Sequence, residues 1–159
     1  MPRRDTGARA RLASEAARLA ERGFAPGWLG DPASLGDAEA ADAEVRLVTS
    51  VVRESPDAAP PVGRSALAGA VRRSLRVLEE RHPGHLVEVR VPPFSAVQIG
   101  IPGVNSVHRR GTPPNVVETD AATWLLLASG DLTWADAVAA HRVSASGAHA
   151  QLDDLLPLR

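Results

Sequence analysis

The sequence has no cysteine, no lysine and no tyrosine, and aromatic residues make up only 3% of its 159 residues. Without cysteine, the chain can form no disulfide, no thiolate metal site and no cysteine nucleophile. Without lysine, it lacks the residue that a P-loop uses to bind nucleotide phosphates. These absences exclude several common classes of redox and nucleotide chemistry.

Net positive charge and long apolar runs are also missing. The formal charge is -1 with a pI near 6.5, so nothing in the overall charge favours a nucleic acid partner. The longest apolar run, Trp124 to Ala128, is far too short to span a bilayer. The first residues, MPRRDTGARARLASEAARLAERG, contain no apolar block of signal-peptide length. We therefore expect a cytoplasmic protein without stable membrane insertion.

No set of residues suggests catalysis or metal binding. His82 and His85 lie close together on a turn that ends a helix, and no third ligand stands beside them in the sequence. Ser144 and Ser146 precede Gly147 but lack the Gly-x-Ser-x-Gly turn of serine hydrolases. The prediction is a protein with no catalytic residues, no metal and no cofactor, and so not an enzyme.

The N-terminal region carries the pattern of two amphipathic helices. The first is predicted over residues 7–22, with Arg11 and Glu15 forming an ion pair on its outer surface. The second is predicted over residues 35–53, with Ser34 as its capping residue. Its first half is acidic, which complements the helix dipole, and we expect these side chains to be solvated. They are Asp37, Glu39, Asp42 and Glu44.

A stretch rich in proline and glycine, ESPDAAPPVG, follows at residues 54–63. Proline and glycine favour turns and extended backbone and interrupt regular helices. We therefore predict a domain boundary here, with a helical segment and linker over residues 1–62 and a second domain over 63–159.

In the second domain, the hydrophobic period changes from that of helices to that of strands. The predicted elements are a helix over 65–81, strands over 87–91, 97–101 and 115–118, two helices between 119 and 140, and a strand over 142–147. The first of the two helices is expected to run from Thr119 or Asp120 to Ser129 and to end at Gly130, and the second to be capped by Thr133. This order describes an α+β domain with a largely antiparallel mixed sheet of about four to five strands. Helices are expected to cover one face of that sheet, and the N-terminal helical segment precedes it.

The stretch TDAATWLLLASGDLTWADAVAAHRVSASG resembles the C-terminal half of sterol carrier protein 2-like (SCP2-like) domains. In that family, a helix that begins at Asp ends at Gly, a second helix packs an alanine on the sheet, and the last strand ends at Gly. Asp120, Gly130, Ala137 and Gly147 have the corresponding spacing. The upstream segments VEVRVPPFSAVQIG and RRGTPPNVVETD are similar to the bacterial branch that is common in actinobacteria. The resemblance covers about residues 65–157.

The resemblance implies a ligand as well as a fold, because such domains enclose an apolar tunnel for sterols, fatty acids or acyl chains. The tunnel would lie between the sheet and the helices that carry Trp124 and Trp134. The apolar residues expected to line it are Phe94, Val97, Ile99, Trp124, Leu125, Ala128, Trp134, Val138 and Leu152. Arg109 and Arg110 are expected to bind the ligand's head group, since arginine holds carboxylates and phosphates bidentately.

The space for such a ligand cannot stay empty. At about 24 cal/mol per Å³, a pocket of roughly 300 Å³ costs on the order of 7 kcal/mol, which is comparable with the whole stability of a domain. A ligand, the tryptophans or a neighbouring helix must therefore fill it. The segment after the last strand, AHAQLDDLLPLR, is shorter than the terminal helix of tunnel-forming relatives. The alternative function is a packed adaptor or structural module that docks on a protein partner without lipid.

Overall fold

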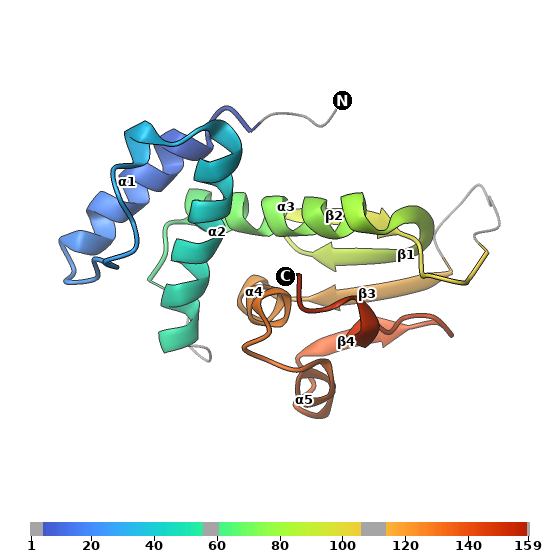
Figure 1. The fold of residues 1–159 in the computed structure, drawn as a ribbon. Helices are drawn as coiled ribbons and strands as arrows, with labels where there is room; N and C mark the ends of the chain where they lie inside the picture. Colours follow the sequence, from blue (N-terminus) through green and yellow to red (C-terminus); the bar gives the residue numbers. More distant parts are fainter. Residues whose placement is uncertain (1–4, 56–60, 106–113, 159) are drawn as a thin grey trace. The chain divides into compact units, whose positions relative to one another are not determined.

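The structure is a computed structural model that describes residues 5–55, 61–105 and 114–158 (Figure 1). The chain forms two compact units, Met1–Arg73 and Ser74–Arg159. Helix α3 (Arg64–Arg81) contributes its first half to unit 1 and its second half to unit 2. The domain boundary predicted between residues 62 and 63 stays a prediction. Within the described ranges, no helix combines the length and the apolarity that crossing a membrane requires.

Unit 1 consists of helices packed through small and aliphatic side chains. It contains α1 (Ala8–Ala20), the short 3-10 helix η1 (Pro32–Ser34), α2 (Asp37–Glu54) and the start of α3. Its buried core comprises Ala8, Leu12, Leu19, Ala40, Ala41, Leu47 and Val51, and the half-buried Phe24 and Leu29 pack against this core. The many alanines let α1 and α2 lie close together.

The start of α2 differs from the sequence prediction. The Ser34 hydroxyl donates to the carbonyl of Asp31 at 2.7 Å and belongs to η1, so it cannot cap α2. The cap is Gly36, whose backbone N–H donates to Glu39 Oε2 at 2.9 Å. The predicted ion pair of Arg11 with Glu15 is also wrong, because Glu15 is 5% exposed and accepts from Arg18 and from the Gly63 backbone.

Unit 2 is built on one mixed sheet. Its strands are β1 (Pro83–Val91), β2 (Ser95–Ile99), β3 (Asn115–Thr119) and β4 (Val143–Ser146), in the order β2-β1-β3-β4. β1 pairs antiparallel with β2 and parallel with β3, while β3 pairs antiparallel with β4. This confirms the predicted α+β class and the largely antiparallel sheet.

The strand register separates an apolar face from a polar one. Val89 lies opposite Val97 on one side and Val117 on the other, and Val89 and Val117 are buried. The preceding residue, Glu88, lies opposite Gln98 and is only half-buried. Since neighbouring residues of a strand point to opposite faces, the aliphatic face is the one that the helices cover.

Two short helices and a C-terminal segment complete unit 2. α4 (Ala121–Ser129) begins at Asp120, whose carboxylate accepts from the Thr123 N–H at 2.9 Å, and ends at Gly130 in the left-handed conformation. α5 (Trp134–Ala139) begins at Thr133, as the sequence predicted. Beyond the 3-10 helix η2 (Asp153–Leu155), the Leu158 N–H donates to the Ala128 carbonyl at 2.8 Å, so the C-terminal segment lies beside the end of α4.

Candidate functional site

The first feature of unit 2 is a continuous aliphatic layer beneath the helices. Its strand residues Val87, Val89, Val91, Ile99 and Val117 have at most 1% of their surface exposed. These positions come from three neighbouring strands, and in Figure 1 the second half of α3 lies in front of β2. Such a layer is the kind of surface against which an apolar chain can be buried.

Trp124 is the largest side chain in this layer and is fully buried. Its indole N–H donates to Ser74 Oγ at 2.8 Å, which joins α4 to the second half of α3. The tryptophan therefore fills space and satisfies its single donor without a ligand. A chain that reached this depth would have to displace the indole ring.

The structure divides the predicted apolar site residues into two groups by exposure. The buried group consists of Ile99, Trp124, Leu125, Ala128 and Leu152, each at most 7% exposed. The accessible group consists of Phe94, Val97 and Trp134, which are half-buried, and Val138, which is 43% exposed.

The accessible group is itself split between two places in the fold. Val97 lies on β2 and Phe94 directly before it, whereas Trp134 and Val138 lie on α5, which packs against α4 and β4. β2 and β4 are opposite edges of the sheet. The structure therefore does not bring the four accessible residues together at one opening.

The predicted head-group residues Arg109 and Arg110 lie outside the described residues. The described parts of the chain contain no group of three or more histidine, aspartate and glutamate side chains that could hold a metal ion.

Sequence reasoning missed a polar hollow of about 330 Å³ at the β2 edge. Its lining comprises Glu79, His85, Glu88, Ala96, Val97 and Gln98. Val97 belongs to the apolar face and Gln98 to the polar face, so the hollow lies where the two faces meet. The alternation of polar residues along both strands was the available signal, but it indicated only a half-buried sheet.

Hydrogen bonds connect the polar residues around this hollow. His85 Nδ1 donates to Gln98 Oε1 at 2.9 Å, and Gln98 Nε2 donates to Glu88 Oε2 at 3.4 Å. The Arg90 guanidinium donates to the other oxygen of Glu88. The bonds fix the Gln98 amide with its oxygen toward the imidazole and its nitrogen toward the carboxylate.

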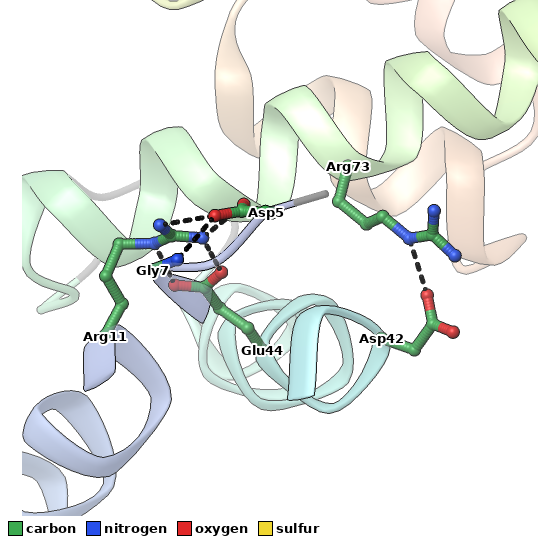
Figure 2. A network of polar contacts seen from close by, with 6 residues as sticks. All are labelled: Asp5, Gly7, Arg11, Asp42, Glu44 and Arg73. Atoms are coloured by element: carbon green, nitrogen blue, oxygen red, sulfur yellow. Dashed lines mark hydrogen bonds and ion pairs between the residues drawn. The ribbon is translucent and has the colours of Figure 1, made fainter. Parts of the chain in front are cut away.

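Unit 1 contains a second polar cluster, buried between its helices (Figure 2). Arg11 donates to both oxygens of Glu44 at 2.8 Å and to both oxygens of Asp5 at 3.0 and 2.6 Å. Glu44 is 1% exposed, which corrects the expectation that it is solvated. At Gly69, a Cβ atom would lie 2.5 Å from Glu44 Oε2, so the third helix approaches the pair through a residue without a side chain.

The electrostatics of this cluster are those of a structural ion triad. Burial raises the pKa of Glu44, although the hydrogen bonds from Arg11 oppose the rise. The hydrogen bonds from Arg11 lower the pKa of Asp5. Arg11 satisfies both acids, and all of the cluster's bonds join elements of unit 1. The cluster connects Asp5, α1 and α2 within unit 1.

Comparison with known protein families gives a match that includes all of the described residues of unit 2. A family model described as "bacterial SCP ortholog" matches residues 63–158, which include every residue of the predicted site. The chain belongs to the bacterial sterol carrier protein (SCP) family. No curated protein matches the chain significantly. Families of this kind are generally lipid carriers rather than enzymes, so membership of the bacterial SCP family suggests lipid carriage at a general level. Helices α1 and α2 precede the matched region.

Proposed function

We propose that unit 2 is a non-enzymatic carrier that binds the apolar chain of a lipid against the aliphatic face of its sheet. The observation that carries this proposal is the family match over residues 63–158. The aliphatic layer formed by Val89, Ile99 and Val117 supplies the physical basis, because each buried CH₂ group gains about 0.8 kcal/mol.

The β2 edge is the proposed entrance for the chain. Val97 is half-buried there, and its cross-strand neighbour Val89 is fully buried. A chain that passes Val97 therefore goes directly from the surface to the aliphatic layer. Beyond it, Ile99 and Trp124 have no exposed surface, so the bound chain must displace protein side chains to go deeper. Of the apolar residues predicted from the sequence, Val97, Ile99 and Trp124 are proposed to contact the ligand in this order, from the β2 edge inward.

A packed adaptor without lipid is the second candidate. The burial and hydrogen bonding of Trp124 favour it, because a filled core needs no ligand. Among the described residues, the exposed large hydrophobic side chains are Trp28 and Val138. Under this alternative, unit 2 binds no apolar chain of any length.

A chain-length series tests carriage. The full chain is titrated with decan-1-ol and dodecan-1-ol by isothermal titration calorimetry, below the concentrations at which they aggregate. Burial of two further CH₂ groups should tighten binding about fifteenfold. Equal affinities, or no binding of either alcohol, would favour the packed adaptor.

A matched pair of variants tests whether the bound alkyl chain passes Val97. Val97→Thr places a hydroxyl on the proposed path and should weaken dodecan-1-ol binding about fivefold. Val116→Thr makes the same change on a half-buried residue of the polar face and should leave binding unchanged. The same loss in both variants would exclude the path past Val97.

A further inference from the structure

Helix α3 is shared by the two units, and two adjacent residues on it bind partners in different units. Arg73, the last residue of unit 1, donates through Nε to Asp42 Oδ1 of α2 at 2.8 Å (Figure 2). Ser74, the first residue of unit 2, accepts the indole N–H of Trp124 at 2.8 Å. Because neighbouring residues of one helix move together, a rotation or shift of α3 must change both contacts at once.

Unit 1 holds the start of α3 through a buried carboxylate of α1. Glu15 is 5% exposed, and its Oε1 accepts the Gly63 N–H at 3.0 Å. Gly63 directly precedes α3, and its N–H is one that the helix itself cannot satisfy. Arg18 donates both to Glu15 and to the Pro61 carbonyl, so α1 also binds the segment that leads into α3. These bonds fix the place where α3 begins.

Unit 1 contacts α3 again at Gly69. A Cβ atom at this position would lie 2.5 Å from Glu44 Oε2 and 2.7 Å from Arg11 Nε. Glycine destabilises the interior of a helix relative to alanine, so its use here is explained by the close approach to the ion triad. The first half of α3 is thus held by α1 at its start, by the triad at Gly69 and by α2 at Arg73.

We propose that α1 and α2 regulate lipid uptake by unit 2, because they hold α3 in the position that keeps Trp124 in place. The indole of Trp124 is fully buried, and α3 carries its hydrogen-bond partner Ser74. This role rests on the lipid carriage proposed above, in which the bound chain displaces side chains near Trp124. It gives a function to the two helices that precede the family match, which begins at residue 63.

A matched pair of glycine variants tests the role of α3. Gly69→Ala adds volume between α3 and the triad, whereas Gly30→Ala makes the same change where no atom lies within 4 Å of the added Cβ. The measurement is hydrogen exchange of the Trp124 indole N–H by NMR in the full chain without ligand, with Trp124→Phe to assign the signal. Gly69→Ala should speed this exchange about tenfold, a typical effect of overpacking, and Gly30→Ala should leave it unchanged.

Two further measurements separate a displaced α3 from a destabilised unit 1. Exchange through a local displacement should not depend on low concentrations of urea, whereas exchange through unfolding accelerates with urea. The double variant Gly69→Ala with Glu44→Ala removes the carboxylate that the new Cβ meets, and should return the exchange to the wild-type rate. Acceleration with urea, or fast exchange in the double variant, would overturn the proposed role of α3.

A second pair of variants loosens α3 without adding volume. Glu15→Ala removes the acceptor of the Gly63 N–H and should speed exchange of the Trp124 indole N–H about fivefold, the effect of losing a helix cap. Glu21→Ala changes an exposed glutamate just after α1 and should have no effect. Equal rates in the two variants would contradict a hold of α1 on α3.

Calorimetric titration with dodecan-1-ol tests the regulation itself. Gly69→Ala should bind the alcohol about tenfold more tightly than the wild type, because the apparent affinity follows the population of the open form. Unchanged affinity despite faster exchange would show that uptake is not regulated through α3, and carriage would stand. If neither protein binds the alcohol, carriage fails and the regulation of uptake fails with it, while the exchange rates still report whether α3 holds Trp124.

Discussion

The two units of the chain differ in the side chains that they bury and in the partners of these side chains. In unit 1, the carboxylate of Glu44 is enclosed between helices and kept there by Arg11, which also holds Asp5. In unit 2, the corresponding layer is aliphatic, and its largest side chain, Trp124, needs only the neutral hydroxyl of Ser74. Opening unit 1 must separate buried charges, whereas opening the layer around Trp124 exposes hydrocarbon and the hydrogen bond between Trp124 and Ser74. The second arrangement suits the exchange of protein side chains for a lipid chain that we propose for unit 2.

The largest expected effect is at Trp124. Trp124→Ala removes a fully buried indole and should lower the free energy of unfolding by about 3 to 5 kcal/mol, as measured by urea denaturation. Saturating dodecan-1-ol should restore part of this loss, because the chain can occupy the new cavity. A loss below about 1 kcal/mol would contradict the view that Trp124 fills the core of unit 2.

The next largest expected change in the free energy of unfolding is at the ion triad of unit 1, formed by Arg11, Glu44 and Asp5. Arg11→Met keeps the apolar stem but leaves Glu44 buried without its partner, which should cost about 3 kcal/mol in urea denaturation. Arg9→Met is the control, since the Arg9–Asp37 pair is largely exposed and is worth at most about 1 kcal/mol.

The double variant Arg11→Met with Glu44→Met tests whether the unpaired charge of Glu44 causes the loss of stability in Arg11→Met. It should recover most of the stability, because no buried charge remains. If the double variant is no more stable than Arg11→Met alone, loss of side-chain packing rather than an unpaired charge explains the effect.

The smallest expected effect is a pH dependence of the free energy of unfolding that arises from Glu44 in unit 1. Burial raises the pKa of Glu44 above its unfolded value, so the stability that this group contributes is present at low pH and is lost as pH rises through its folded pKa. We expect Glu44→Gln to gain stability relative to the wild type as pH rises above the unfolded glutamate pKa of about 4.3. Urea denaturation at several pH values measures this difference.

Asp5 provides the opposite control. Arg11 lowers its pKa, so its contribution is present above the unfolded pKa and is lost as pH falls through the folded value. Asp5→Asn should therefore lose stability relative to the wild type as pH rises through the unfolded pKa. The same trend in both variants would show that the assigned signs are wrong.

Local features of the fold were predictable from the sequence. Gly130 and Thr133 were identified as helix ends, and Asp120 was one of two candidates beside Thr119, because capping depends on residues only a few positions apart. Ser34 was misassigned because η1 offers its hydroxyl a nearer acceptor, the carbonyl of Asp31.

Features that depend on distant residues were not predictable in this way. Arg11 binds Glu44, which is 33 residues away in the sequence, rather than Glu15, which is nearer in the sequence. The packing of α1 on α2 explains this pairing. The hollow at β2 likewise requires the end of α3 beside two strands, which no local pattern of Glu79 or Gln98 reveals. The site predicted by family resemblance named apolar residues that the structure distributes between a buried layer and two sheet edges.

Unit 2 is proposed to carry a lipid. The most direct measurement is native mass spectrometry of the full chain purified from its host, followed by organic extraction of whatever is bound. We expect a stoichiometric adduct that extracts as a lipid with a long apolar chain. A mass equal to that of the chain alone, unchanged after incubation with dodecan-1-ol, would contradict this proposal.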